Sequence, residues 1–339
     1  MRVFLLIVKM MASLGLAMFI NSAQAASKVI DVLAVYTKGA ADVYQGDPST
    51  RINHLFQITN QIYQDSGLDI EIRLVKTMMV DYTDDNSGET ALRDITFAEN
   101  AVFKDVQKVR EQTHADMVIF YRPFKSEHGS CGQAWIVGEG SNGDFSNPDY
   151  KNYMYSHIPL NSCGDFATAH ELGHNMGLKH SRRQDGTGGA FPYALGHGVD
   201  NEFATIMAYQ SSFNVDYWDG KVYKFSSPAL VCKGKPCGVD KTDVSAGADA
   251  RYALSVVAPH IANFYSGVTS SSSSSSVLSV NSSLSVTSNT ASSTSSVAAT
   301  VIDKQPVQTT AASSGGGGGG SINIIFLLSL FSLMFIRRR

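Results

Sequence analysis

The chain has 339 residues, of which 43% are hydrophobic and 17% are charged, and its formal net charge is −3 at pH 7. Residues 1–25 and 315–339 hold five basic residues and no acidic residue, so the part between them has a formal charge of −8. This acidic balance excludes a protein built to neutralise nucleic-acid phosphates, and we expect no nucleic acid among its partners.

The first 25 residues have the pattern of a secretory signal peptide. Two basic residues, Arg2 and Lys9, precede an apolar run at residues 10–20, and residues 23–25 form a small-x-small cleavage site. We therefore expect residues 1–25 to be removed and the mature chain to begin at Ala26, outside the cytoplasm. An uncleaved membrane anchor is the alternative.

Residues 26–266 form the predicted globular domain, in which apolar residues recur with the periods of strands and helices. Strands and helices alternate over its first half, which favours a mixed α/β (α+β) fold with a largely parallel sheet and helices packed on it. The predicted strands cover residues 29–36, 68–75, 115–121, 133–137 and 153–159, and the predicted helices cover residues 50–65, 97–112, 166–178 and 248–265.

Four cysteines lie in this domain, and an even number in an exported chain indicates two disulfide bonds. Three pairings are possible. Cys232 and Cys237 close a short loop, so we expect them to pair, which leaves Cys131 with Cys163. A zinc cluster is the alternative use of these thiols, but the sequence offers only one close pair.

The third predicted helix contains the pattern H-E-x-x-H-x-x-G-x-x-H at residues 170–180. His170 and His174 are four residues apart, so their imidazoles leave the same helix face and can bind one tetrahedral Zn²⁺. Gly177 can adopt a positive φ, which would end the helix and let His180 supply the third ligand. Three protein ligands leave one position for water, as is typical of a catalytic zinc site.

Glu171 lies beside the first of these histidines and is not needed as a ligand. We expect it to act as the general base on a zinc-activated water and then to pass the proton to the leaving amine of a peptide. An amphipathic helix with surface histidines is the alternative explanation of the pattern.

These residues resemble the active site of a metzincin zinc endopeptidase. Metzincins also have a Met-turn, which places a methionine beneath the zinc-binding histidines, and residues 205–209 (Thr-Ile-Met-Ala-Tyr) match it with Met207 as the methionine. The resemblance implies a twisted mixed sheet with packed helices, the zinc helix and the Met-turn. Ordinary core packing is a compatible explanation of Met207.

Tyr209 stands where astacin- and serralysin-like metzincins have a tyrosine near the metal. The resemblance implies that this side chain donates a hydrogen bond to the oxyanion or ligates the resting zinc. A packed aromatic side chain is the alternative.

Within this clan, the chain resembles bacterial reprolysin-like peptidases, related to the adamalysins, over roughly residues 28–265. Residues 131–135 (Cys-Gly-Gln-Ala-Trp) resemble the edge-strand segment of that group, whose cysteine pairs with the one just before the zinc helix, here Cys163. Ser181 departs from the pattern, because adamalysins usually have Asp directly after the third histidine. No cysteine-switch segment is present, so we expect no latency through an N-terminal thiol.

The C-terminal part has the composition of a stalk followed by a sorting signal. Residues 267–314 are rich in Ser, Thr, Val and Ala, which predicts a disordered stalk. Residues 315–339 consist of a glycine run, a short apolar segment and three terminal arginines, and they resemble the GlyGly-CTERM sorting tails of Gram-negative bacteria. The resemblance implies a short transmembrane helix, cleavage by a rhombosortase-type protease and type II secretion. A permanent single-span anchor is the alternative.

Other polar residues have weaker patterns. His197 is more easily explained as a loop residue than as a fourth ligand. Arg182 and Arg183 could favour acidic residues in a substrate, although a solvated charge pair is the commoner explanation. The Asp- and Asn-rich residues 81–86 could bind Ca²⁺, but they lack the spacing of a calcium loop and favour a turn, so a calcium requirement stays open.

The sequence therefore predicts a monomeric, exported zinc endopeptidase of protein or peptide substrates, secreted or held at the cell surface by its C-terminal helix. The substrate would bind extended along the edge strand at residues 133–137. A surface-displayed binding module on the same scaffold is the alternative. Glu171 argues against it, because binding alone does not need this carboxylate. The pattern does not give the substrate.

Overall fold

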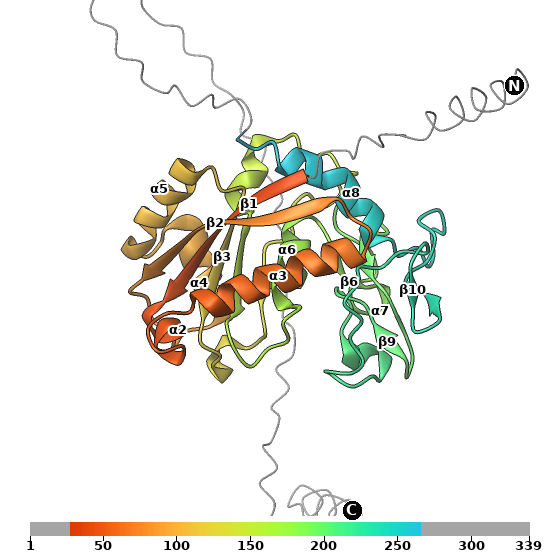
Figure 1. Ribbon diagram of the computed structural model, residues 1–339. Helices are drawn as coiled ribbons and strands as arrows, with labels where there is room; N and C mark the ends of the chain where they lie inside the picture. The colour runs from red at the N-terminus through yellow and green to blue at the C-terminus, as the bar shows by residue number, and fades with distance from the viewer. Residues whose placement is uncertain (1–27, 266–339) are drawn as a thin grey trace, which may run out of the picture. The chain divides into compact units, whose positions relative to one another are not determined.

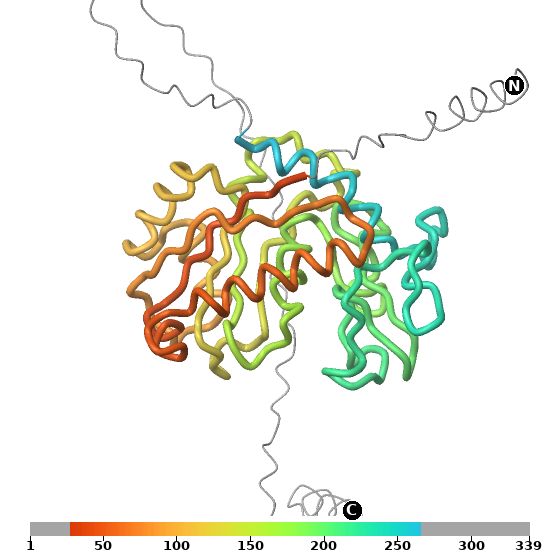
Figure 2. The backbone as a smooth tube through the Cα atoms, in the orientation of Figure 1, coloured from red at the N-terminus to blue at the C-terminus, as the bar shows by residue number. Residues whose placement is uncertain are grey.

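The structure is a computed structural model that describes residues 28–265 (Figures 1 and 2). The strands are β1 Lys28–Thr37, β2 Ile70–Val80, β3 Met117–Arg122, β4 Gln133–Ala134, β5 Tyr155–Pro159, β6 Lys179–Ser181, β7 Leu195–Gly196, β8 Gly198–Val199, β9 Phe203–Ala204, β10 Val231–Cys232 and β11 Lys235–Pro236. The α-helices are α2 Lys38–Val43, α3 Ser49–Asp65, α4 Gly88–Phe97, α5 Lys104–Thr113, α6 Ala167–Asn175, α7 Arg182–Asp185 and α8 Ala250–Ile261. The 3₁₀ helices are η1 Ala101–Phe103, η2 Ser126–His128, η3 Pro148–Tyr153 and η4 Gln210–Phe213.

The main sheet has five strands in the order β2-β1-β3-β5-β4. β1 pairs in parallel with β2 and β3, and β3 pairs in parallel with β5. β4 runs antiparallel to β5, with Gln133 opposite His157. All six residues of β3 are buried, as expected for a central strand with both faces covered. The predicted mixed, largely parallel sheet is confirmed, and β4 is one of its two edge strands.

Helix α3 crosses in front of the sheet in Figure 1 and packs on β2 and α6. Its buried residues, which include Ile52, Leu55, Thr59 and Ile62, recur every three to four positions, so one face of the helix contributes to the core. The strands predicted at residues 29–36, 115–121 and 153–159 are confirmed as β1, β3 and β5, and the helices predicted at residues 50–65, 166–178 and 248–265 as α3, α6 and α8.

The helix predicted at residues 97–112 corresponds to α5, which begins later than predicted because η1 precedes it, and α4 has no counterpart among the predicted elements. The side chain of Ser87 caps α4 by accepting the N–H of Thr90, and the helix ends at Ala98, which has a φ of 50°. Asn100 caps η1 in the same way. A left-handed residue cannot continue a right-handed helix, so the chain turns at Ala98. The short helix α2 has no counterpart among the predicted elements.

Residues 179–249 contain strands of only two or three residues, and they lie on the right in Figures 1 and 2. The Cys232–Cys237 disulfide closes the β10–β11 hairpin and packs against Phe203. The Cys131–Cys163 disulfide ties the segment before β4 to the segment before α6. Both predicted pairings are confirmed. The crosslinks restrict the unfolded chain, which helps to stabilise regions with little regular structure.

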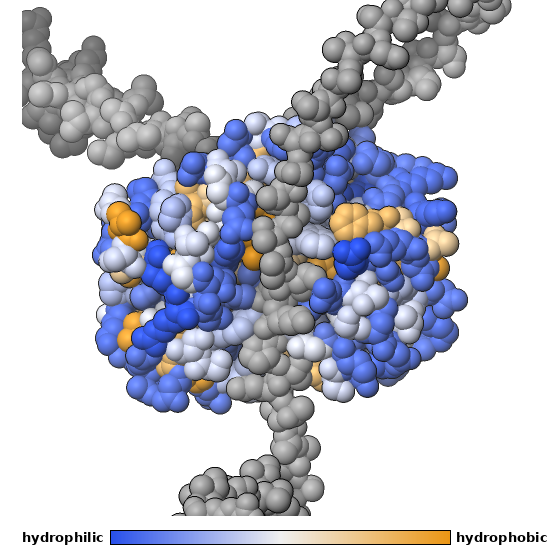
Figure 3. Space-filling view, turned by 180° about the vertical axis from the view of Figure 1, so that it is seen from behind, coloured by the Kyte–Doolittle hydropathy of each residue, from blue (hydrophilic) through white to orange (hydrophobic). Residues whose placement is uncertain are grey.

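The predicted signal peptide, stalk and sorting tail lie outside the described residues. Within residues 28–265, no helix combines the length and apolar character needed to cross a membrane. The face drawn in Figure 3 is mainly hydrophilic with scattered apolar patches. Large exposed apolar side chains come from separate elements, as Val43, Phe97 and Val244 illustrate, and such isolated side chains are usual on a protein surface.

Candidate metal centre

The predicted zinc-binding helix is α6, which lies behind α3 in Figure 1. All nine of its residues are buried, including His170, Glu171 and His174. Titratable side chains are rarely buried without partners or a metal, because removing them from water costs free energy. Three of them buried on one short helix therefore mark a candidate functional site.

The chain reverses directly after α6 at Gly177. This residue has a φ of 79°, and a Cβ atom there would lie 2.6 Å from the Cβ of Ala190. Its N–H donates to the carbonyl oxygen of His174 at 2.9 Å, which satisfies one of the last carbonyls of the helix. Glycine fits both the φ and the space. The reversal places His180 in the short strand β6.

The reversal brings His170, His174 and His180 together, with one ring nitrogen of each within 4.8 Å of the others. The Nε2 atoms of His170 and His174 lie 3.1 Å apart. Two nitrogen ligands on a tetrahedral zinc lie about 3.3 Å apart, because each zinc–nitrogen bond is about 2.0–2.1 Å long. The spacing of these two nitrogens therefore fits a single metal ion.

Hydrogen bonds at Nδ1 orient the two histidines of α6. His170 Nδ1 lies 2.8 Å from the carbonyl oxygen of Ile206, and His174 Nδ1 lies 2.8 Å from that of Leu178. Because a carbonyl can only accept, each Nδ1 is the protonated nitrogen and each Nε2 of the neutral ring has a lone pair. Two lone pairs directed at each other across 3.1 Å are the arrangement that a cation between them would stabilise. The histidines thus fit a metal ion in chemistry as well as in spacing.

His180 is oriented by a carboxylate instead. Asp185 Oδ2 lies 3.0 Å from His180 Nδ1 and accepts the backbone N–H of His180 at 2.8 Å. Ser181, the position where the family resemblance leads one to expect Asp, precedes α7, and its hydroxyl donates to Gln184 Oε1 at 2.7 Å. An acidic partner for the third histidine is therefore present, but it comes from the end of α7. The zinc motif alone did not reveal it.

Met207 lies against α6, as the Met-turn resemblance implies. Its side chain is fully buried, and a Cβ atom on Gly173 would lie 2.8 Å from its Sδ atom. The neighbouring Ile206 is also buried, and its carbonyl oxygen is the one that orients His170. The turn therefore supports the helix through close packing and one histidine through a hydrogen bond.

Tyr209 lies beside the histidines, with its ring centroid 4.4 Å from that of His180 and 6.2 Å from that of His170. Its side chain is almost buried, at 9% exposed, and its backbone N–H donates to Gln184 Oε1 at 3.1 Å. The structure therefore brings Tyr209 to the candidate metal site, and the ring is packed there as well.

The carboxylate of Glu171 lies against Gly132, which directly precedes β4. A Cβ atom on Gly132 would lie 2.1 Å from Glu171 Oε1 and 2.5 Å from its carboxyl carbon. A side chain at position 132 would therefore displace the carboxylate. Glycine allows the edge strand to approach the predicted general base, a role that the sequence patterns did not assign to it.

The edge strand is shorter than predicted, because only Gln133 and Ala134 pair with β5. Beyond them, the carbonyl oxygen of Trp135 accepts a hydrogen bond from Asn175 Nδ2 at 3.0 Å, so the chain is attached to α6 instead of the sheet. β4 nevertheless occupies the sheet edge. The outer side of an edge strand is a template for pairing with an extended chain.

The weaker sequence patterns have structural explanations. Arg183 pairs with both carboxylate oxygens of Asp200, and Arg182 donates to three backbone carbonyls. His197 is not in the group of potential metal ligands, and burial, followed by the charge of Arg183, lowers its pKa. Residues 81–86 form a bend between β2 and α4. Within residues 28–265, the group of potential metal ligands is the three histidines of the motif.

A second buried histidine pair lies elsewhere in the domain. The ring centroids of His128 and His157 are 5.1 Å apart, and Arg122 Nε donates to His157 Nε2 at 2.8 Å. Burial, and then the charge of Arg122, lowers the pKa of His157 well below its usual range. The same two causes lower the pKa of His128 to about 4. This pair is a structural cluster around a buried guanidinium.

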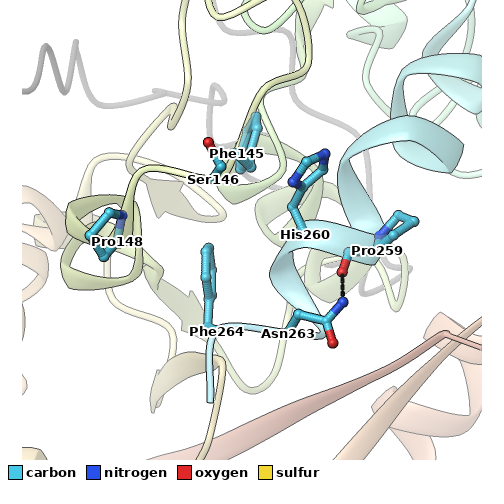
Figure 4. Close-up of a pocket in the computed structure, with 7 residues that line it drawn as sticks. All are labelled: Phe145, Ser146, Pro148, Pro259, His260, Asn263 and Phe264. Atoms are coloured by element: carbon cyan, nitrogen blue, oxygen red, sulfur yellow. Dashed lines mark hydrogen bonds between the residues drawn. The ribbon is translucent and has the colours of Figure 1, made fainter. Parts of the chain in front are cut away.

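Figure 4 shows a cavity of about 460 Å³ at the C-terminal end of α8. His260 is the one ordinary acid–base side chain in its lining, so the cavity offers no set of catalytic groups. The lining residues are Phe145, Ser146, Pro148, Pro259, His260, Asn263 and Phe264.

The sequence matches the model of metallo-peptidase family M12 over residues 26–219. The chain is 32% identical over 261 residues to the peptidyl-Asp metalloendopeptidase of Pseudomonas aeruginosa, a match that covers 72% of this chain and 41% of the relative. Proteins of the same name from Stenotrophomonas maltophilia and Xanthomonas campestris are 27% and 24% identical, covering 65% and 72% of this chain and 51% and 54% of the relatives. The chain spans about half the length of these relatives.

Among solved structures, one titled "Structure of a chaperone-substrate complex" is similar with a TM-score of 0.53 and 21% sequence identity. The match covers 70% of this chain and 35% of that chain. At this identity, the likeness shows the fold alone. The match to the reprolysin-type family model confirms the resemblance and fold class predicted from the motif.

Proposed function

Because the chain belongs to metallopeptidase family M12, we propose that it is a zinc-dependent endopeptidase that hydrolyses peptide bonds in protein or peptide substrates. The observation that supports this proposal most strongly is the convergence of His170, His174 and His180 beside the buried Glu171. Three histidine ligands leave a coordination position open, which distinguishes a catalytic zinc site from a closed structural one.

The three histidines hold the metal, and their partners keep them in position. The carbonyl oxygens of Ile206 and Leu178 fix the tautomers of the two histidines on α6, and Asp185 holds the third. Such partners orient metal ligands and raise their basicity. A Zn²⁺ ion bound there supplies a Lewis acid that polarises the scissile carbonyl and lowers the pKa of water.

Glu171 acts as the general base. Its carboxylate lies between α6 and the start of the edge strand, so it can reach a water molecule that attacks a peptide held along that strand. It takes the proton as the water attacks and delivers it to the nitrogen of the leaving amine. The C–N bond of the peptide then breaks without a covalent enzyme intermediate.

Tyr209 stabilises the developing oxyanion. Its ring lies against His180 at the candidate metal site, and a phenol can donate one hydrogen bond to an oxygen that gains negative charge. The substrate pairs with the outer side of β4 as an added antiparallel strand. The backbone of the substrate thus provides register, and its side chains provide selectivity.

The substrate bond proposed here is the one on the amino side of aspartate. The three curated relatives described above are named peptidyl-Asp metalloendopeptidases. The match to the family model spans residues 26–219, which contain the candidate metal centre and the edge strand. A complementary cation in the site would favour a substrate with an acidic side chain.

The test is cleavage of casein and of a mixed peptide library by the purified full chain, with products identified by mass spectrometry. Cleavage should stop on removal of zinc by a chelator and return when zinc is added. The Glu171→Gln variant should bind zinc and cut nothing, because it keeps the size of the side chain without its basicity. A wild-type chain that binds one zinc ion and cuts no peptide in the library would contradict the proposal.

The proposed place of action is outside the cytoplasm. Two disulfide bonds in the domain support an oxidising compartment. The residues before and after the domain carry the signal-peptide and GlyGly-CTERM patterns, which motivate export, rhombosortase-type processing and type II secretion. Terminal sequencing of the protein recovered from cells and medium tests this: a mature form that keeps residues 1–25 and 315–339 would contradict it.

A further inference from the structure

A buried lysine lies beneath the candidate metal centre and has no role in the mechanism described above. Lys221 is 7% exposed, and its Nζ atom donates to the carbonyl oxygens of Thr205, Ile206 and Ala208 at 3.2, 3.2 and 2.6 Å. These three carbonyls belong to the Met-turn. The ammonium also lies 4.5 Å from the ring centroid of Phe166, the residue that precedes α6.

The direction of a bound substrate can be derived from β4 and α6. Gly132, before β4, lies against Glu171, and Trp135, after β4, bonds to Asn175 at the end of α6, so the strand and the helix run in the same direction. A substrate added antiparallel to β4 runs the opposite way. The substrate residues that follow the cleaved bond therefore lie toward the beginning of α6.

Aromatic side chains pack together near the beginning of α6, and one of them lies against the ammonium of Lys221. Tyr217 donates from its hydroxyl to Cys131 Sγ at 3.8 Å, and its ring centroid lies 6.1 Å from that of Phe166. Phe166 in turn lies over the ammonium. The Cys131–Cys163 disulfide joins the cysteine that Tyr217 contacts to the segment that leads into α6. This side of the centre thus combines aromatic walls with one cation.

We propose that Lys221 forms the subsite that binds the acidic side chain of the substrate residue following the cleaved bond. The proposal rests on the endopeptidase function proposed above and names the residue that selects for aspartate. The carboxylate replaces one of the two longer contacts of the ammonium, those to Thr205 and Ile206. A charged acceptor forms a shorter and stronger hydrogen bond to an ammonium than a neutral carbonyl does.

The other cations near the centre are engaged elsewhere. Arg183 forms a bidentate pair with Asp200 on an exposed surface, and Arg182 donates to backbone carbonyls of residues 186, 192 and 247. Lys179 pairs with Glu139. Lys221 is the cation that packs against both the Met-turn and the residue before the zinc helix.

The experiment uses three peptides that differ only at the residue after the cleaved bond, which is Asp, Asn or Glu. The ratio of kcat/KM for the Asp peptide to that for the Asn peptide should be at least about 100 in the full-length wild-type chain. In Lys221→Met this ratio should fall to between about 1 and 3, even if kcat/KM also falls for both peptides. A ratio unchanged in Lys221→Met would overturn the proposal.

Lys221→Arg provides a second test in case the methionine variant does not fold. It keeps the charge and the donors to the Met-turn, but its guanidinium reaches farther and binds a carboxylate in a planar geometry. The Asp-to-Glu ratio should change by at least about threefold, with both acids still preferred over Asn. Unchanged ratios for all three peptides would contradict the proposal.

Arg183→Met is the matched control, since it removes a cation on the exposed side of the centre, and it should keep the preference for Asp. If wild type cleaves no peptide, the proposed function fails. If it cleaves all three peptides equally, the endopeptidase function stands, and the preference for aspartate fails together with the proposed subsite.

Discussion

The domain buries two sets of histidines, and their surroundings give them opposite chemistry. At the candidate metal centre, backbone carbonyls accept from Nδ1 of His170 and His174, and the Nε2 atoms of these rings face each other. In the second set, the guanidinium of Arg122 donates to Nε2 of His157 and so occupies its lone pair. Burial alone therefore does not make a histidine a ligand. The partner at the other ring nitrogen decides whether a lone pair is available for a metal.

The comparison also separates function from stability. The first set has acceptors around it and leaves room for a cation. The second set is built around a cation that the chain itself supplies, and the charge of Arg122 contributes to lowering the pKa of both His128 and His157. We expect changes in the first set to remove activity, and changes in the second set to reduce the free energy of unfolding without removing the metal.

The largest expected effect is loss of a ligand from the first set. His174→Gln should lose its zinc at micromolar metal and lower kcat/KM by at least about 10³-fold, because two ligands cannot hold the ion in a catalytic geometry. Metal analysis and peptide cleavage measure the two effects. The matched variant His157→Gln should retain one zinc per chain. Loss of zinc from both variants would show that the two sets are not distinct.

The next effect concerns the buried guanidinium. Arg122→Met should lower the free energy of unfolding by about 3–5 kcal/mol, because the acceptors of a buried charge are left without their donor. Those acceptors include His157 Nε2 and Asn86 Oδ1. Urea unfolding measures the change. Arg93→Met removes an exposed partner of Glu99 and should cost less than about 1 kcal/mol. Equal effects of the two substitutions would contradict the account.

A smaller effect is expected at the carboxylate that orients the third histidine. Asp185→Asn should weaken zinc binding by about 10- to 100-fold, since an amide holds His180 without the negative charge. Competition with a chelator of known affinity measures the change. Asp200→Asn, which alters the carboxylate paired with Arg183, serves as the control and should bind zinc as wild type does. Wild-type zinc affinity in both variants would show that Asp185 does not support the metal centre.

The smallest effect is a pH dependence of the second set. Burial lowers the pKa of His128 to about 4 in the folded chain, so the unfolded chain takes up a proton first as the pH falls below about 6.5. The stability contributed by the neutral ring is complete above that pH and is lost on acidification toward pH 4. His128→Gln should therefore lose about 1–2 kcal/mol less stability than wild type between pH 7 and pH 4.5.

Urea unfolding of zinc-free samples at each pH measures this difference. The three motif histidines are present in both proteins, so their contribution to the pH dependence is the same and does not affect the comparison. Glutamine is the matched replacement, because its amide can donate to the carbonyl oxygen of Asp84 as His128 can. Parallel pH profiles for wild type and His128→Gln would contradict the lowered pKa.

Local patterns predicted the parts of the site that lie within one turn or one motif. His170, His174, Gly177 and His180 are close in sequence, so helix geometry and one glycine suffice to place them. A largely parallel sheet also followed from the alternation of strands and helices, although the order of its strands comes from the structure. The break between α4 and α5 did not, because the left-handed Ala98 has no side-chain signature that a periodic pattern would register.

The supporting residues could not be found in the same way. Asp185 approaches His180 only because α7 begins directly after β6, and Lys221 reaches the Met-turn from a connection more than ten residues downstream. Gly132 faces Glu171 across two elements that are far apart in the chain. The contacts of Lys221 and Gly132 depend on tertiary packing, which no local period encodes, whereas the contact of Asp185 depends on the turn into α7. Ser181 illustrates the same limit, since the acid missing after the third histidine is supplied by a different position.

The most direct test of the central claim is X-ray diffraction at the zinc absorption edge from crystals of the purified protein grown with one equivalent of zinc. The account predicts one anomalous peak within about 2.1 Å of the Nε2 atoms of His170, His174 and His180. No peak is expected near His128 and His157. A zinc ion bound elsewhere in the domain, or one that leaves any of the three motif histidines unligated, would contradict it.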